Sequence, residues 1–183
     1  MRVPELSYEQ LSPEQKDIFD EITAGPRGRV NGPFLVWLHR HELLRRGQAL
    51  GLYCRFNSGL EPRLSELTIL VVSSHWQAET EWHDHSVNAI KLGVDADALE
   101  ALRVGKPAKF KKQDEQALYE FVSELLKTHR VSDPTYKRAV ETFGQDLVID
   151  LVGIVGYYCL IAMTLNAFEV PLPAGASNPF AQK

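Results

Sequence analysis

Apolar residues recur at helical spacing along most of the chain, and no stretch alternates apolar and polar residues as a half-buried strand would. Cap and breaker residues divide this pattern into segments. The expected helices cover residues 12–23, 32–38, 41–56, 61–77, 78–92, 95–99, 114–129, 132–143 and 146–168. With 183 residues, the chain is long enough for one domain with a sizeable core. The pattern therefore predicts a single all-α domain over residues 1–183, with an extended arm at 1–11 and an irregular tail at 171–183.

Residues 146–168 form the longest apolar stretch. Its uninterrupted part is about 16 residues, shorter than the ~20 that a bilayer requires. We therefore expect a buried core helix with close helix contacts at Gly153 and Gly156, and no membrane span. In the helix at 41–56, Gly47 and Gly51 also predict close approach of a neighbouring helix, and the buried side is expected to hold Leu43, Leu44, Leu50 and Tyr53.

Polar groups able to move protons concentrate between Glu66 and Gly93. Glu66 lies among apolar residues on almost every side of its helix, and a carboxylate buried there needs a partner. A break near Gln77 separates this helix from a second one. There Glu81 stands one turn before His85, close enough to interact. The inward line of this second helix is expected to be Ala78, Trp82, His85, Ala89 and Leu92.

Two interpretations of Glu66, Glu81 and His85 are open. They form a proton relay in a dry pocket, in which burial raises the pKa of the Glu66 carboxyl so that it holds a proton near neutrality. Alternatively, Glu81 and His85 form a buried ion pair that ties helices together, and Glu66 pairs with Arg63 or a backbone group.

Other chemistries have weaker support. His75, Glu79 and His83 stand at i+4 steps and would form a metal site only on a helix unbroken at Gln77, so we expect no metal. Cys54 and Cys159 lie in apolar contexts, as inert core thiols do. The sequence has no Gly-rich phosphate cradle, which argues against a nucleotide, and we expect no cofactor.

Three elements resemble the carboxymuconolactone decarboxylase-like family, which shares its fold with the alkylhydroperoxidases. They are Arg63-x-x-Glu66, then Glu79-x-Glu81-Trp82-x-x-His85, then a short helix ending at Gly93. The resemblance is strongest over residues 32–105. The peroxidase branch of that family carries Cys-x-x-Cys where this chain has Ala78 and Glu81, so its thiol chemistry does not transfer.

The resemblance implies an alkylhydroperoxidase-like helical bundle that assembles as a homo-oligomer: a dimer, trimer or hexamer. It also implies cofactor-free decarboxylation or proton-shift chemistry on a small carboxylated lactone or ring acid of aromatic catabolism. The catalytic residues would be Glu66, Glu81 and His85. Residues expected to contact the substrate are Trp37, His39, Trp82 and Ala78, although Trp37 also suits the core and His39 a helix end.

A carboxylated substrate requires a cation, and the motif itself contains no basic residue that faces His85. Arg55, Arg63 or an arginine of a partner subunit are the candidates. Two other functions stay open: a peroxide-linked stress protein that has lost the cysteine pair, and a non-catalytic oligomeric module in which the polar cluster joins subunits.

Composition limits the kinds of binding partner and the cellular setting that we expect for this chain. The net charge is −4 and there is no long basic run, so we expect no nucleic-acid binding. The two cysteines have no metal or redox spacing, and the first ten residues have no apolar leader segment. A reduced, cytoplasmic setting is the expectation that follows.

Overall fold

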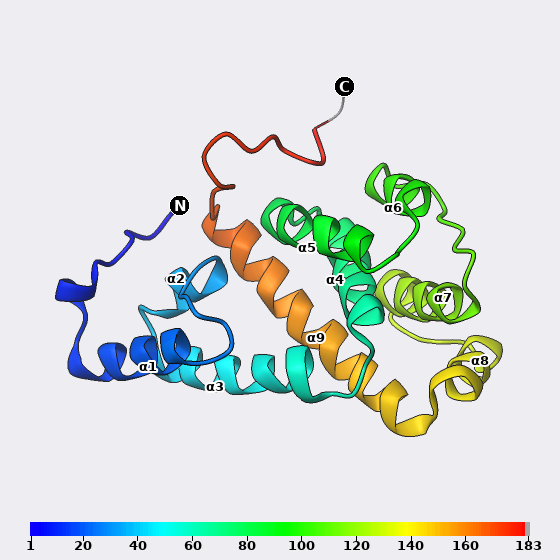
Figure 1. Cartoon of the computed structure of the whole chain (residues 1–183), viewed down its shortest axis with the longest axis horizontal. Helices are drawn as coiled ribbons and strands as arrows, with labels where there is room; N and C mark the ends of the chain where they lie inside the picture. The colour runs from blue at the N-terminus through cyan, green and yellow to red at the C-terminus, as the bar shows by residue number, and fades with distance from the viewer. Residues whose placement is uncertain (182–183) are drawn as a thin grey trace.

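The computed structural model describes residues 1–181, and within them the chain is helical with no strand. The all-α prediction is confirmed (Figure 1). The helices are α1 (Pro13–Ala24), α2 (Pro33–Trp37), α3 (His41–Leu52), α4 (Pro62–Trp76), α5 (Glu79–Lys91), α6 (Ala96–Arg103), α7 (Gln113–Thr128), α8 (Asp133–Phe143) and α9 (Gln145–Phe168). A 3-10 turn at Tyr8–Gln10 interrupts the N-terminal arm, and a π-helical turn, Tyr53–Asn57, continues α3.

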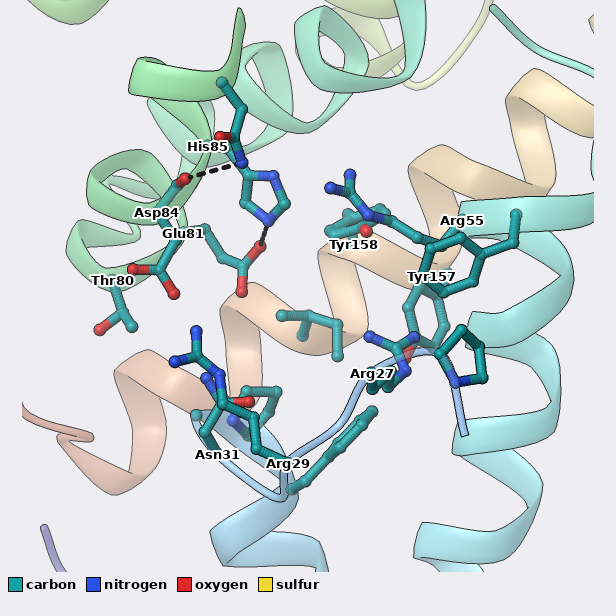
Figure 2. A pocket seen from close by; sticks show the side chains of 17 residues that line it. Arg27, Arg29, Asn31, Arg55, Thr80, Glu81, Asp84, His85, Tyr157 and Tyr158 are labelled. Carbon is teal, nitrogen blue, oxygen red and sulfur yellow. Dashed lines mark hydrogen bonds and ion pairs between the residues drawn. The ribbon is translucent and has the colours of Figure 1, made fainter. Parts of the chain in front are cut away.

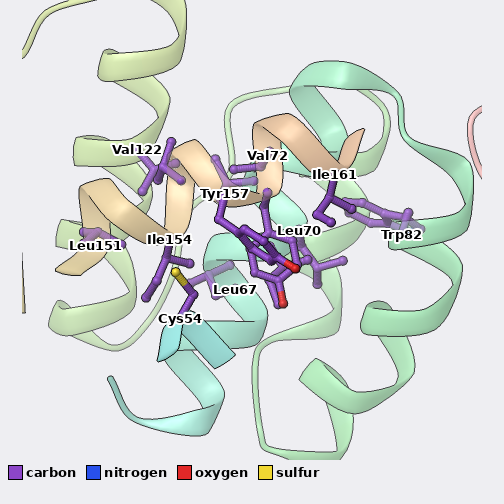
Figure 3. Packing of buried hydrophobic residues seen from close by; sticks show 14 of the residues in the cluster. Cys54, Leu67, Leu70, Val72, Trp82, Val122, Leu151, Ile154, Tyr157 and Ile161 are labelled. Carbon is purple, nitrogen blue, oxygen red and sulfur yellow. The ribbon is translucent and has the colours of Figure 1, made fainter. Parts of the chain in front are cut away.

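Helix α9 is the central element. It crosses the molecule between α1–α3 on one side and α4–α8 on the other (Figure 1). Its inner face packs against α4, where Ile154 and Ile161 of α9 join the same apolar cluster as Leu67 and Leu70 of α4 (Figure 3). These side chains are at most 3% exposed. The central contact between α4 and α9 therefore supports the helix that carries Glu66.

The outer face of α9 differs from the sequence expectation. By length and composition alone α9 is apolar enough to cross a membrane, but half of its most apolar window is buried inside the chain, as in a core helix. Gly153 and Gly156 are exposed, and no atom lies within 4 Å of where a Cβ would stand on either. The close contacts predicted at these glycines are absent from the described chain, because α4 covers the opposite face of α9.

Helix α3 presents a different face to the core than predicted. Leu44 is buried, but Leu43, Leu50 and Tyr53 are 44–47% exposed. The buried line is Leu44, Gly47, Gln48 and Gly51, which follows helical spacing. The close approach predicted at the two glycines is confirmed: a Cβ on Gly47 would lie 2.6 Å from the Trp37 ring. Gly47 and Gly51 lie on this inner face beside Leu44, because the Trp37 and Tyr157 rings occupy the space where larger side chains would stand.

Both ends of the described chain fold back onto it. The Arg2 backbone N–H donates to the Phe168 carbonyl at the end of α9. The tail from residue 171 to 181 runs past α5 in the direction of α6 (Figure 1), and the Phe180 ring packs edge-on against Trp82 of α5 with centroids 5.5 Å apart. The Asn178 amide donates to Glu79 Oε1 at 2.6 Å. The irregular tail predicted at 171–183 therefore covers α5 of its own chain in residues 171–181, and residues 182–183 are outside the described range.

Gly47→Ala tests the α2–α3 contact. The added methyl group would collide with the buried Trp37 ring, and overpacking of this kind costs about 1–3 kcal/mol. We expect urea denaturation to show that loss. Arg46→Ala is the control: it places alanine at the neighbouring, exposed position of the same helix, so stability should change by at most about 0.5 kcal/mol. Equal losses in the two variants would contradict this packing.

Candidate functional site

The α4–α5 hairpin brings the three predicted catalytic residues together. Gln77 adopts the left-handed conformation (φ 49°) and ends α4, which confirms the predicted break. The chain then reverses, so His85 Nδ1 lies 2.6 Å from Glu66 Oε2, although the residues are 19 positions apart. His85 Nε2 lies 3.2 Å from Glu81 Oε2, near enough for an ion pair but not aligned as a hydrogen bond. The imidazole therefore stands between two carboxylates.

Arg55 completes the group on the other side of Glu66. Its Nη2 donates to Glu66 Oε1 at 2.6 Å. The π-helical turn at Tyr53–Asn57 carries Arg55, and such turns frequently occur at functional sites. The sequence suggested Arg63 as one possible partner of Glu66. Arg63 instead binds Asp114 and Glu115 of α7, at 2.6 Å each. Arg63 thus ties α4 to α7, and Arg55 neutralises Glu66.

The protonation state at Glu66 is the reverse of the sequence expectation. Burial favours the neutral acid, but the His85 and Arg55 cations outweigh burial and lower the pKa of Glu66 below its usual 4.5. Burial likewise opposes charge on His85, but Glu66 and Glu81 outweigh it and raise the pKa of His85 to about 9. At neutral pH the proton therefore resides on His85 and not on Glu66.

Hydrogen-bond chemistry points to the same state. A neutral imidazole has one donor and one acceptor, whereas the imidazolium presents an N–H at both nitrogens. Each ring nitrogen of His85 faces a carboxylate oxygen, so only the cation offers a donor to both. The three side chains are 5%, 11% and 14% exposed for Glu66, Glu81 and His85.

Glu81 and His85 open onto a cavity of about 350 Å³, within the range of small-molecule sites (Figure 2). Helix α5 forms one wall. Tyr157, Tyr158 and Ile161 of α9 and the π-helical turn form another. The loop before α2 and the first turn of α2 close it with polar and apolar groups: Pro26, Arg27, Arg29, Asn31 and Gly32 of the loop, and Pro33 and Phe34 of α2. Four cationic groups (Arg27, Arg29, Arg55 and His85) and two carboxylates (Glu81 and Asp84) line this space, so it favours an anionic guest.

The four residues expected to contact substrate lie outside the cavity lining. The Trp37 indole N–H donates to Thr164 Oγ1 at 3.0 Å in the core, and Ala78 is buried at the start of α5. His39 Nε2 bonds the Pro4 carbonyl at 2.9 Å, which anchors the N-terminal arm. Trp82 faces Phe180 of the tail. Trp82 and Ala78 lie on the buried line of α5 beside the core, while Leu92 at its end is 44% exposed, against expectation.

Sequence reasoning did not identify Arg27, Arg29, Tyr157 and Tyr158 as site residues. The arginines lie in a short loop between Gly25-Pro26 and Gly32-Pro33, and polar loop residues held between rigid elements are frequent binding groups. The position of this polar loop was therefore a usable sequence signal for Arg27 and Arg29. The two tyrosines stand inside the longest apolar run of the chain, where nothing distinguishes them from core aromatics.

Metal and thiol chemistry gain no support from the geometry. The break at Gln77 interrupts the ladder of His75, Glu79 and His83 that a metal site would need, and no group of three possible ligands forms among residues 1–181. Burial raises the pKa of Cys54 and of Cys159, and neither cysteine is part of the described cavity lining.

No family model and no curated protein matches the sequence, but solved structures match it over nearly its whole length. The alkylhydroperoxidase AhpD core of a peroxidase-related protein from Ralstonia eutropha JMP134 aligns with a TM-score of 0.75 and 17% identity, covering 98% of this chain and 94% of that one. The chain has the alkylhydroperoxidase-like fold.

Two further structures agree with this fold. A peroxidase-related protein from Silicibacter sp. TM1040 has a TM-score of 0.74 and 16% identity, covering 95% of this chain and 91% of its own. The debrominase Bmp8, in complex with 2,3,4-tribromopyrrole, has a TM-score of 0.72 and 14% identity, covering 98% and 94%. At these identities the likeness establishes the alkylhydroperoxidase-like fold and leaves the activity to be argued from the site.

The stability of the fold should depend on pH through His85. Its pKa rises from 6.5 in the unfolded chain to about 9 in the fold, so its contribution is complete below pH 6.5 and is lost as pH rises through about 9. We expect the stability advantage of the wild type over His85→Gln to fall across that window by on the order of 3 kcal/mol. Denaturant unfolding at a series of pH values measures it.

His83→Gln is the control, because His83 is on the same helix and outside the cavity lining. Its stability difference from the wild type should not follow the same curve. If the stability difference between the wild type and His85→Gln stays constant or increases with pH, His85 is neutral in the fold.

Proposed function

We propose that this protein is a cofactor-free enzyme that decarboxylates, or moves a proton within, a small carboxylated lactone or ring acid. The observation that supports this most directly is the position of His85 between Glu66 and Glu81 at the wall of a cavity, where the two carboxylates raise its pKa to about 9. A group that keeps its proton at neutral pH and faces a bound molecule is suited to act as a general acid.

The two protons of the imidazolium have different surroundings. Glu66 accepts a hydrogen bond from His85 Nδ1–H, and Arg55 keeps Glu66 ionised. The Nδ1 proton therefore stays on the imidazole ring. The Nε2 proton faces Glu81, whose Oε2 makes no aligned hydrogen bond. Glu81 also lines the cavity. The mobile proton therefore has a route from Nε2 to Glu81 Oε2 and on to the substrate.

In a decarboxylation, the bond between the ring carbon and the carboxylate breaks and its electron pair stays on the ring as CO₂ leaves. The ring then takes one proton, which Glu81 delivers and His85 supplies. The neutral His85 that remains still donates Nδ1–H to Glu66, and water restores the lost proton. Arg55 and the other cations stabilise the negative charge that develops on the ring in this desolvated site.

The matching structures bear on the choice between enzyme types. Bmp8 was solved with a small halogenated ring, 2,3,4-tribromopyrrole, so a protein of this fold accommodates a ligand of that size. The peroxidase-related matches favour peroxide chemistry as the alternative function. Peroxide reduction needs an accessible thiolate, however, and both cysteines have raised pKa values and neither lines the cavity.

We also propose that the active form is a homo-oligomer. Ile149, Val152 and Met163 lie at helical spacing on the outer face of α9 and are 43–62% exposed. Tyr53, whose hydroxyl donates to Asp150 of α9 at 2.7 Å, extends this apolar face toward Phe56 at the cavity rim. A second copy of the chain would cover this face and one edge of the cavity.

Glu81→Gln tests the proton route. It removes the acidic group but keeps the size of the side chain, and loss of a general acid or base costs about 10²–10⁴-fold in rate. We expect CO₂ release from 4-carboxymuconolactone to fall by that factor, and to fall similarly in His85→Ala. Glu79→Gln is the matched control, since Glu79 lies on the same helix but faces Asn178 of the tail.

Two results would contradict the proposal. If the wild type releases no CO₂ from 4-carboxymuconolactone or related ring acids, the protein is not a decarboxylase of this class. If it instead consumes peroxide, and Cys54→Ser or Cys159→Ser abolishes that activity, the alternative function is correct.

Val152→Lys tests the oligomer. A charge on the outer face of α9 would be buried in an interface of two copies but harmless on a monomer, where Val152 is 47% exposed. Light scattering should give a multiple of the chain mass for the wild type and a smaller assembly for the variant. A monomeric wild type would contradict the proposal.

A further inference from the structure

We propose that Arg27 and Tyr157 form a carboxylate-binding subsite in the cavity, across from Glu81 and His85, and that Gly51 keeps it open. Figure 2 shows Arg27 and Tyr157 together on one side of the cavity and His85 with Glu81 on the other. This inference rests on the proposed function in one respect: it assumes that the substrate of that reaction carries a carboxylate. It adds the position at which that carboxylate binds.

The first observation is a pair of buried donors with no acceptor. Arg27 and Tyr157 both line the cavity, and the atoms Arg27 Nη2 and Tyr157 Oη are covered from solvent with no hydrogen-bond partner within the described chain. Tyr157 as a whole is 3% exposed. Burial raises the pKa of Tyr157 to about 12, so its hydroxyl keeps its proton at neutral pH. Leaving a buried polar group unpaired costs about 1–3 kcal/mol, and more for a charged one. Two such groups in one cavity call for an anionic oxygen that accepts from both.

The second observation is that the two donors converge on Gly51. A Cβ built on Gly51 would lie 2.7 Å from Arg27 Nη2 and closer still to Tyr157 Oη. Both atoms therefore lie over the same bare stretch of α3 backbone. Any side chain at position 51 would displace one or both of them, so glycine is required there for the donors to occupy these places.

The third observation is that Arg27 is held in position before any ligand binds. Its Nε donates to Gln48 Oε1 at 2.7 Å, and Gln48 is 2% exposed. Its guanidinium stacks over Phe34 at 4.9 Å and lies 5.9 Å from Phe56. These contacts fix the planar group but leave Nη2 free, so little side-chain entropy is lost when an anion binds.

The other arginines near the cavity are less suited to this role. Arg55 donates to Glu66, and Arg63 is bound by Asp114 and Glu115 on the far side of α4. Arg29 lines the cavity but is exposed, where a charge contact contributes little. Arg27 is the cation in the described cavity wall that combines a half-buried position with a buried donor atom lacking a partner.

The subsite also constrains the substrate. An ion pair stabilises a carboxylate in the ground state and so opposes its loss as neutral CO₂. The carboxylate bound by Arg27 is therefore the one retained. For a decarboxylation this predicts a ring diacid, whose second carboxylate is lost elsewhere in the cavity; for a proton shift it predicts a ring monoacid. In both cases the bound carboxylate directs the ring toward Glu81.

Calorimetric titration with benzoate and with benzamide, its uncharged isostere, tests the subsite without turnover. The wild type should bind benzoate and bind benzamide at least ~10-fold more weakly. Arg27→Met should weaken benzoate binding by about 10–100-fold, the worth of a charge-assisted contact. Tyr157→Phe removes one hydroxyl and keeps the ring packing, and should weaken it by about 3–10-fold. Gly51→Ala should abolish it.

Arg46→Met is the matched control: it removes the same charge from an exposed position on α3 that pairs with Glu42. It should leave benzoate affinity unchanged. Glu81→Gln should retain benzoate binding, so failure of the proposed chemistry and failure of the subsite are separable. Equal affinity for benzoate and benzamide, no binding of either, or unchanged benzoate affinity in both Arg27→Met and Tyr157→Phe would overturn the subsite.

Discussion

The burial of one carboxylate, Glu66, organises this structure. It lies in the apolar α4 helix against α9, where an unpaired charge would cost several kcal/mol. Its two oxygens are satisfied from two directions, by His85 of α5 and by Arg55 of the π-helical turn. Each partner requires a particular backbone feature: the left-handed residue Gln77, which reverses the chain into α5, and the π-helical turn that follows α3. The segments that form the cavity are therefore placed where they supply the partners that the buried Glu66 carboxylate requires.

A buried acid paired with two cations is also what a purely structural clamp would contain. Two features distinguish this site from a clamp. The imidazole continues the pairing to Glu81, whose Oε2 is left without an aligned hydrogen bond beside an open cavity. The same cavity contains Arg27 and Tyr157 with unused donors. A clamp pairs all of its own groups, whereas the wall of this cavity holds two donors, Arg27 Nη2 and Tyr157 Oη, for which the described chain supplies no acceptor.

Much of the local structure was predictable from the sequence, because caps, glycines and apolar spacing act over a few residues. Most helix boundaries, the break at Gln77 and the meeting of Glu66, Glu81 and His85 belong to this class, although the helix expected at 95–99 runs from Ala96 to Arg103. The errors arose where tertiary packing decides. Trp82 was assigned to substrate contact from the family resemblance, yet it packs against Phe180 of the tail. The pKa of Glu66 was predicted to rise from burial alone, because the Arg55 contact depends on a π-helical turn that no short pattern signals. The polar loop that contains Arg27 was a usable signal, but the role of Arg27 was not predictable, since it depends on Gly51, Gln48 and Tyr157 on distant segments.

The charge on His85 at rest is the central claim, since the proton route, the state of Glu66 and the anionic guest all depend on it. Nitrogen NMR of protein labelled with ¹⁵N at histidine, with the His85 signals assigned through His85→Gln, reads that charge directly from the two ring nitrogens. The account predicts that both nitrogens of His85 carry protons at neutral pH and that one is lost only near pH 9. A single protonated ring nitrogen at neutral pH, the signature of neutral imidazole, would contradict it.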